Sequence, residues 1–299
     1  MPENLIARLH GELSHATHID PHSHIEPQAA AATGLADILG YHYFTELAHS
    51  AGVPRERIEG EGVAPDARLD AVVSGLERFS NTVQHSWLLR IARDLFGWEA
   101  QTITPDNWRT LDATVRQRAG EPGWADSVLE KSHIEAVFLT NDFDDPLEGF
   151  DTSRYVPCLR VDELVFHTGK PGVIDRLAAT AGIEVASSGQ LTEALGRVAA
   201  RFRDRGAKAA AISLPPGFRP QEVEQAAFAR SVEAVLRDGL NADAGHRSIV
   251  SQGVFWHVAR CCREQQLPFD LMIGVRRGVY PGGVYQGQDL LDGRLSLAD

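Results

Sequence analysis

Hydrophobic residues follow a helical period through a long stretch near the start of the chain. From about residue 28 to residue 131, apolar side chains recur every three or four positions, with loops rich in glycine, proline and charge between the repeats. The repeat is strongest over residues 70–96, which we expect to be helical. Thr104, followed by Pro105, predicts the N-cap and first turn of another helix, because threonine can accept an orphan amide hydrogen there. We therefore predict helices and loops throughout residues 28–131.

Short apolar runs of a different kind flank this helical segment. After an amphipathic lead-in, one run precedes the segment, and four follow it in alternation with stretches that predict helices. The five expected strands are residues 17–25, 134–140, 154–160, 207–213 and 268–274. The helices expected among the later strands are residues 189–205, 220–240 and 246–265. Because strands that alternate with helices indicate parallel βα units, the expected fold class is α/β, with a large helical insertion after the first strand.

A pair of histidines marks the end of the first predicted strand. On an extended strand, residues i and i+2 point to the same side, so His22 and His24 would direct their imidazoles into one volume. Neutral imidazole is a common ligand of zinc, nickel, manganese and iron. The carboxyl end of a strand is also where (β/α) barrels place their chemistry. The pair therefore predicts a site for one divalent metal ion, the alternative being two ordinary polar residues.

The number of strands bears on the architecture. A (β/α)₈ TIM barrel needs eight strands, and five can be counted. Either the architecture is not a closed barrel, or the C-terminal strands are missing from this sequence. We favour the second and expect a single incomplete barrel domain over residues 1–299, with the remaining strands beyond Asp299. The run at residues 268–274 would then present an unpaired sheet edge.

Composition narrows the choice of partners and compartment. The 299 residues carry a net charge of −12, which disfavours binding to a nucleic-acid backbone. The three cysteines, Cys158, Cys261 and Cys262, are odd in number and include an adjacent pair, so a disulfide framework is not expected. No leader-like or membrane-spanning apolar run is visible. We expect a cytoplasmic protein that binds neither nucleic acid nor membrane.

Six segments in series resemble one family, the uronate isomerases of the amidohydrolase superfamily. The first contains Asp20, His22 and His24 in the spacing Asp-x-His-x-His, and the second contains Gly40, His42 and Tyr43. The six segments are residues 20–24, 40–43, 84–97, 137–146, 156–162 and 273–277. Their order and spacing hold over nearly the whole chain, so the resemblance rests on the series and not on any single motif.

The resemblance implies a distorted (β/α)₈ barrel of the metal-dependent hydrolase type that interconverts D-glucuronate and D-fructuronate. This aldose–ketose isomerisation moves a proton between C1 and C2. His22 and His24 would hold one divalent ion, zinc foremost and manganese, iron or nickel as alternatives. The third ligand, an aspartate at the end of strand eight, is expected beyond Asp299.

Four further residues match functional positions of that family. Arg160 and Arg277 match positions that bind the acidic sugar, and the guanidinium group suits a carboxylate because it can donate two parallel hydrogen bonds. His42 and Tyr43 match the loop over the substrate and could take part in proton transfer. For Arg160 the alternative is a salt bridge to a neighbouring acidic residue at the strand end. The expected partner is a small acidic sugar, and a homo-oligomer is possible.

Three positions depart from the family pattern. Tyr41 stands in place of an aspartate, and Leu214 and Met272 stand where the family has an active-site aspartate and histidine. Neither leucine nor methionine can ligate a hard metal or carry a proton. Two alternatives to an isomerase therefore stay open: a metal-dependent hydrolase or lactonase, and a catalytically inactive relative that keeps the fold.

Overall fold

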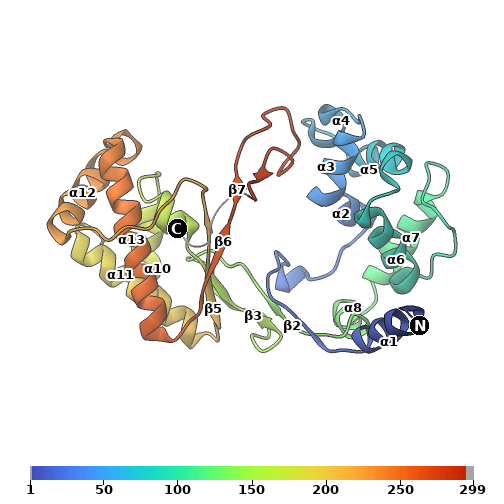
Figure 1. The fold of residues 1–299 in the computed structure, drawn as a ribbon, viewed down its shortest axis with the longest axis horizontal. Helices are drawn as coiled ribbons and strands as arrows, with labels where there is room; N and C mark the ends of the chain where they lie inside the picture. The colour runs from blue at the N-terminus through green and yellow to red at the C-terminus, as the bar shows by residue number, and fades with distance from the viewer. Residues whose placement is uncertain (1, 294–299) are drawn as a thin grey trace. The chain divides into compact units, whose positions relative to one another are not determined.

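The computed structural model describes residues 2–293 and divides the chain into two compact units (Figure 1). The first unit comprises residues 1–17, 29–134 and 276–291, and the second comprises residues 18–28, 135–275 and 292–299. Among the described residues, no helix combines the length and the apolarity needed to cross a membrane.

Between residues 29 and 134 the first unit consists of helices and loops, as the sequence predicts. One short pair of strands, β7 (Val275–Arg276) and β8 (Leu290–Leu291), accompanies the helices. The helices are α1 (Pro2–Ser14), α2 (Leu35–Leu39), α3 (His42–Ser50), α4 (Arg55–Glu59), α5 (Pro65–Gly75), α6 (Val83–Phe96), α7 (Trp108–Ala119) and α8 (Trp124–Lys131), with short 3₁₀ turns at Pro27–Ala29 and Leu76–Phe79.

Three helix boundaries in this unit differ from the predicted ones. Helix α5 begins at Pro65, five residues before the predicted start at residue 70. The predicted helix 70–96 is interrupted, because Thr82 caps the new helix α6 by accepting a hydrogen bond from the His85 amide at 3.3 Å. The helix predicted to begin at Thr104 starts instead at Trp108. The Asn107 side chain accepts a hydrogen bond from the Thr104 amide at 2.8 Å, which closes a turn before the helix.

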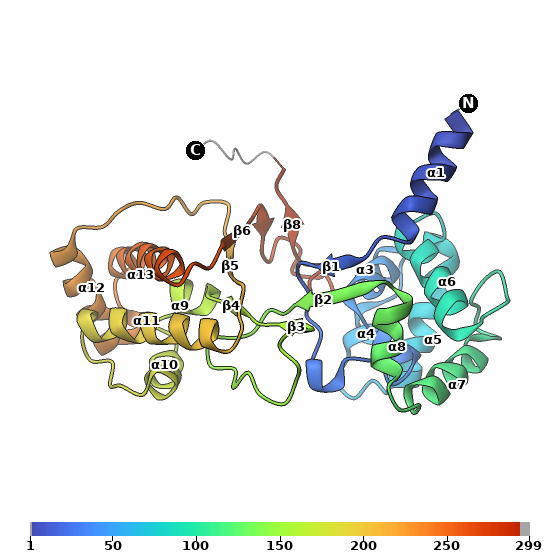
Figure 2. The same ribbon diagram turned by 90° about the horizontal axis from the view of Figure 1, so that it is seen from below.

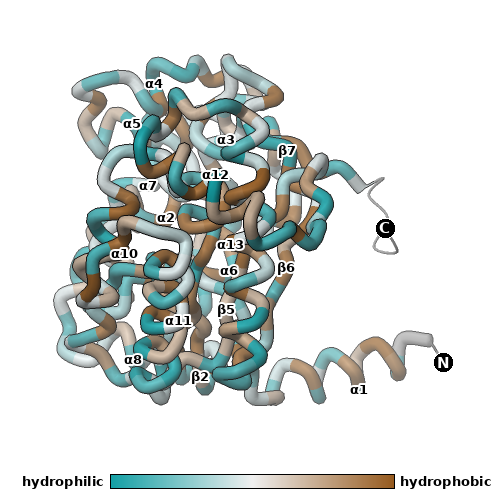
Figure 3. The backbone as a smooth tube through the Cα atoms, turned by 90° about the vertical axis from the view of Figure 1, so that its left-hand side faces the viewer, coloured by the Kyte–Doolittle hydropathy of each residue, from teal (hydrophilic) through white to brown (hydrophobic). Residues whose placement is uncertain are grey.

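The core of the first unit is built by the inner faces of its helices, while the lead-in helix α1 adds little to it. Trp108, 1% exposed, is the largest fully buried side chain, and its Nε1 donates to Asp70 Oδ1 at 2.9 Å. Val284, in the segment between β7 and β8, is 0% exposed and joins the same cluster. On α1, hydrophobic and hydrophilic residues alternate along the helix (Figure 3), and its large apolar side chains are exposed: Leu5, Ile6, Leu9 and Leu13.

The second unit holds the main strands, and they follow the five predicted positions. The strands are β1 (His18–Asp20), β2 (Ile134–Phe138), β3 (Tyr155–Val156), β4 (Cys158–Arg160), β5 (Ala209–Leu214) and β6 (Phe269–Ile273). The helices are α9 (Asp162–Phe166), α10 (Val173–Ala181), α11 (Ser188–Asp204), α12 (Gln225–Asp238) and α13 (Ala244–Gln265), with a 3₁₀ turn at Gly239–Asn241. Helices α9 and α10 have no counterpart in the prediction, and α12 starts five residues later than predicted.

The strands follow one another in chain order. One ladder runs β1-β2-β3 and another runs β4-β5-β6, and an isolated parallel bridge between Asn141 and Leu159 connects the end of β2 to β4. The predicted third strand is split into β3 and β4, because Pro157 between them has no amide hydrogen for the ladder. The pairings of β2 with β3, β4 with β5 and β5 with β6 are parallel. These observations confirm an α/β fold, and closure into an eight-stranded barrel stays a prediction.

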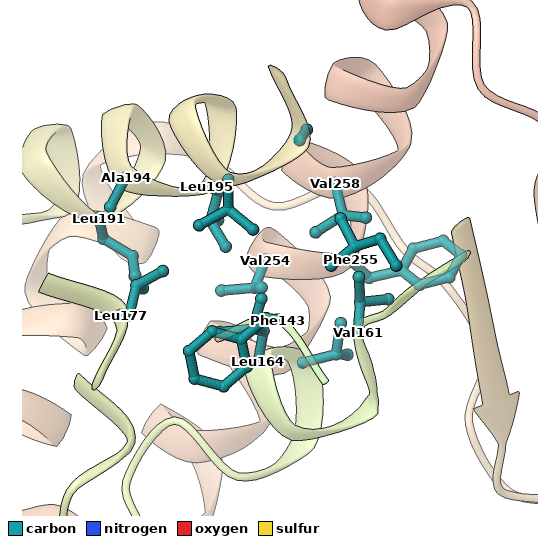
Figure 4. Packing of buried hydrophobic residues seen from close by; sticks show 14 of the residues in the cluster. Phe143, Val161, Leu164, Leu177, Leu191, Ala194, Leu195, Val254, Phe255 and Val258 are labelled. Atoms are coloured by element: carbon teal, nitrogen blue, oxygen red, sulfur yellow. The ribbon is translucent and has the colours of Figure 1, made fainter. Parts of the chain in front are cut away.

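The register of β4, β5 and β6 separates two faces. Arg160 pairs with Ala211 and Ser213 pairs with Met272, so these four side chains share one face. The opposite face carries Leu214, which is 6% exposed. It packs with residues of helices α9, α11 and α13, among them Leu195 and Val254 in Figure 4. The helices α10–α13 lie to one side of these strands in both ribbon views (Figures 1 and 2).

This arrangement corrects one expectation about the departures from the family pattern. Leu214 and Met272 were expected to replace two polar groups that face the same cavity. Successive residues of a strand point to opposite faces, and Leu214 lies on the face away from Ser213 and Met272. Leu214 is therefore a core residue under the helices, and Met272 is the departure that lies on the face of Arg160.

Helices α12 and α13 approach so closely that a glycine is required between them. A Cβ atom on Gly253 would lie 2.2 Å from Cδ2 of the buried Phe228 ring. We predict that Gly253→Ala lowers the free energy of unfolding by about 1–3 kcal/mol, because overpacking outweighs the better helix propensity of alanine. The matched control is Gly196→Ala on α11, where nothing lies within 4 Å of the new atom, and it should stabilise by about 0.5–1 kcal/mol. Urea unfolding of both variants measures the difference, and equal effects would contradict the packing argument.

Candidate functional site

The two histidines lie in the loop that follows β1, and not on the strand itself as predicted. The strand ends at Asp20, whose Oδ1 accepts a hydrogen bond from the His22 amide at 3.1 Å and so turns the chain. Pro21, lacking an amide hydrogen, also cannot extend the ladder. The imidazoles of His22 and His24 nevertheless come together, with ring centroids 5.1 Å apart and planes at 87°.

The segment that carries these histidines is tied to the end of β2. The Ser23 amide donates to the Phe138 carbonyl oxygen at 2.8 Å. The Thr140 hydroxyl donates to the Ser23 carbonyl oxygen at 3.2 Å, and its Oγ1 lies 2.9 Å from His24 Nδ1. The amide and the carbonyl group of Ser23 are thus both hydrogen-bonded to residues at the end of β2. His22 and His24 lie on either side of Ser23 in the sequence, so these hydrogen bonds hold the segment that carries them.

The separation of the rings fits a shared metal ion. Two imidazole nitrogens bound at about 2.0–2.1 Å around a tetrahedral ion place their ring centroids roughly 5 Å apart. The observed 5.1 Å agrees with that value. Within residues 2–293, no group of three or more histidine, cysteine, aspartate or glutamate residues could hold a metal. The described part of the chain therefore offers two ligands of a type that suits zinc and related ions.

A groove of about 480 Å³ runs beside His24 and is strongly acidic. It is lined by Thr140 and by three aspartates after the end of β2, Asp142, Asp144 and Asp145. Burial raises the pKa of Asp142 above its ordinary value, and the nearby charges of Asp144 and Glu163 raise it further. The groove thus combines an imidazole with a carboxyl group that is easier to protonate than usual.

Arg160 is held at the carboxyl end of β4 by two partners. Its Nε donates to Asp162 Oδ2 at 2.9 Å, and one terminal nitrogen donates to Ser213 Oγ at 3.1 Å. Asp162 Oδ1 also accepts a hydrogen bond from the Ser213 amide at 3.0 Å, so one carboxylate joins β4, α9 and β5. The salt bridge that was the alternative reading of Arg160 is present. Its role in binding a sugar carboxylate stays a prediction.

The predicted proton-transfer residues lie in the first unit, at the start of α3. The ring centroids of His42 and Tyr43 are 4.4 Å apart, and those of Tyr41 and His42 are 4.2 Å apart. Burial lowers the pKa of His42 below its ordinary value of 6.5. The imidazole is therefore neutral at neutral pH and has a lone pair that can accept a proton.

Arg277 lies in the same unit as His42. It pairs with Asp289 and lines a pocket of about 400 Å³ together with Arg55. A second pocket, of about 270 Å³, is lined by His42, and the two pockets share Glu59 and Tyr285. The first unit therefore brings His42 and Arg277 into one region, while His22, His24 and Arg160 belong to the second unit.

Two residues at these sites were missed by the sequence analysis. Thr140 contacts His24, and Ser213 contacts Arg160, and both lie at the carboxyl ends of strands. A polar residue after an apolar strand is a weak signal by itself. It could have been noticed for Thr140, because Thr140 is the last residue of the strand predicted over residues 134–140, and the carboxyl ends of strands are where (β/α) barrels place their chemistry.

Comparison with known proteins gives relatives by structure only. No protein-family model and no curated protein matches the sequence. A uronate isomerase from Thermotoga maritima matches with a TM-score of 0.83 at 18% identity, covering 97% of this chain and 68% of the other. A glucuronate isomerase from Caulobacter crescentus matches with a TM-score of 0.80 at 17% identity, covering 93% and 63%.

A uronate isomerase from Bacillus halodurans also matches, with a TM-score of 0.70 at 20% identity, covering 99% of this chain and 66% of the other. This chain thus spans about two thirds of the length of each of these proteins. At such low identity a structural match establishes the fold. Over nearly all of its length, the chain has the fold of the uronate isomerases.

Proposed function

We propose that this protein is a metal-dependent isomerase of sugar acids, similar to the uronate isomerases, and that it interconverts D-glucuronate and D-fructuronate. The observation that carries the proposal is the pair His22 and His24, whose rings lie 5.1 Å apart in a fold shared with solved uronate isomerases. Two imidazoles at this separation suit one divalent ion, with zinc foremost and manganese, iron or nickel as alternatives. The ion, when bound, would polarise the oxygen atoms of the sugar as a Lewis acid.

The remaining roles fall to residues of the chain itself. His42, neutral because burial lowers its pKa, would accept the proton that moves between C1 and C2, with Tyr43 beside it as a second candidate. Arg160 and Arg277 would bind the sugar carboxylate. The position of Leu214 in the core under the helices supports retained activity, because this departure lies away from the face that carries Arg160. The three free cysteines fit a reducing compartment such as the cytoplasm.

Proton transfer at C2 gives a direct test. The purified protein is loaded with Zn²⁺ or Mn²⁺ and incubated in D₂O with D-glucuronate, and proton NMR follows exchange at C2 and the appearance of the ketose. We expect both signals with the metal and neither after chelation. Hydrolysis of glucuronolactone without exchange at C2 would favour a lactonase instead. If the protein binds the metal but consumes neither D-glucuronate nor glucuronolactone, an inactive relative is favoured.

A further inference from the structure

The contact between Thr140 and His24 determines which nitrogen of the imidazole carries its proton. Oγ1 of Thr140 lies within hydrogen-bond distance of the Ser23 carbonyl oxygen, at 3.2 Å, and of His24 Nδ1, at 2.9 Å. A threonine hydroxyl has one hydrogen to donate and lone pairs to accept with. A carbonyl oxygen can only accept, so the hydroxyl donates to Ser23. For both hydrogen bonds to form, the hydroxyl must accept from His24, and His24 Nδ1 must carry the hydrogen.

The backbone around the pair keeps this arrangement in place. Ser23 is also held through its amide, which donates to the Phe138 carbonyl oxygen at 2.8 Å. Thr140 is two residues beyond Phe138, directly after β2. His24, next to Ser23, and Thr140, near Phe138, are therefore both held by the hydrogen bonds between the loop after β1 and the end of β2. The orientation of the His24 ring follows from that pairing, although the ring itself is exposed.

We propose that Thr140 is a positioning residue that holds His24 as the Nδ1–H tautomer and thereby makes Nε2 the metal-binding nitrogen. A metal-bound histidine commonly donates its other ring N–H to an oxygen atom, which fixes the tautomer and the ring orientation. Here the oxygen is a threonine hydroxyl, and its own hydrogen is committed to the backbone. The proposal rests on the metal site of the proposed function and adds the residue that prepares it.

The variants that test the role differ by single groups. Thr140→Val removes the hydroxyl and keeps the shape of the side chain, whereas Thr140→Ser keeps the hydroxyl. The control is Thr192→Val in the same unit, where the threonine hydroxyl donates to the Gly189 carbonyl oxygen and contacts no imidazole. Thermal unfolding of all three variants checks that the fold is retained.

The first measurement needs no metal. Two-dimensional ¹⁵N–¹H NMR of the histidine side chains, in metal-free protein at a pH where imidazoles are neutral, distinguishes the two tautomers, and a His24→Gln sample assigns the signals of His24. We expect the Nδ1–H form in the wild type, in Thr140→Ser and in Thr192→Val. In Thr140→Val we expect a shift toward the Nε2–H form, which free histidine prefers. An Nε2–H form of His24 in the wild type would overturn the proposal.

The second measurement is Zn²⁺ affinity by competition with a chelator. We expect Thr140→Val to bind Zn²⁺ about 10–100-fold more weakly, the usual loss when such an outer partner is removed, and Thr140→Ser and Thr192→Val to stay close to the wild type. Equal affinities for Thr140→Val and Thr140→Ser would also overturn the proposal. The tautomer is read without metal or substrate, so a negative isomerase assay leaves this result intact.

Discussion

Replacing both His22 and His24 with alanine is expected to abolish stoichiometric binding of a divalent metal. The proposed site consists of these two imidazoles, whose ring centroids lie 5.1 Å apart, and within residues 2–293 no group of three or more histidine, cysteine, aspartate or glutamate residues could hold the ion instead. Each substitution would remove one proposed ligand, and the acidic groove beside His24 has no second imidazole to replace it. The measurement is elemental analysis of protein that has been loaded with Zn²⁺ and then freed of unbound metal.

A second pair of neighbouring histidines provides the control. His15 and His133 have ring centroids 6.4 Å apart in the first unit. Asparagine at both positions is the suitable replacement, because His133 has φ +54° and asparagine tolerates that conformation. This control should keep its metal. Unchanged metal content after loss of His22 and His24 would place the ion elsewhere and remove the basis of the proposed function.

Arg160→Lys is expected to raise the KM for an acidic sugar by roughly 10–100-fold. An arginine can donate two parallel hydrogen bonds to a carboxylate, and a lysine supplies a single point charge. Hydrogen bonds to charged groups are worth about 1.5–3 kcal/mol, which corresponds to such a change in affinity. Steady-state kinetics with D-glucuronate, together with calorimetric binding, measure the effect.

The existing contacts of Arg160 make a control necessary. Asp162 and Ser213 already bind its guanidinium group, so lysine also weakens the link between β4 and β5. Arg197→Lys on α11 disturbs a comparable pairing, with Glu193 and the Ala181 carbonyl oxygen, at a distance in sequence from the strand ends. If Arg160→Lys lowers stability as Arg197→Lys does and leaves KM unchanged, Arg160 is a structural residue only.

The periodic elements of the fold were accessible from the sequence. Burial on one face imposes a repeat, so α11 and the positions of the later strands could be found from local pattern alone. Helix α10 was missed because it is only nine residues long. The glycines that flank it, Gly172 with φ +80° and Gly182 with φ +65°, give a signal that could have located it.

The candidate site was predicted only in part, for a physical reason. The spacing of His22 and His24 is local and therefore visible in the sequence. Thr140 is 116 residues away from His24, and its role depends on the pairing between the loop after β1 and the end of β2. The same applies to Leu214, because the face on which a strand residue lies depends on the register, which a shift of one residue inverts.

Val284, fully buried among helices that end by residue 131, has a consequence for the order in which the chain folds. During synthesis, the helical core lacks this side chain until more than a hundred further residues have been made. Burying a valine contributes roughly 1.5–2 kcal/mol. Because contacts over such a sequence separation form late, the first unit should be completed only after the strands of the second have been synthesised, so its final packing is a late step of folding.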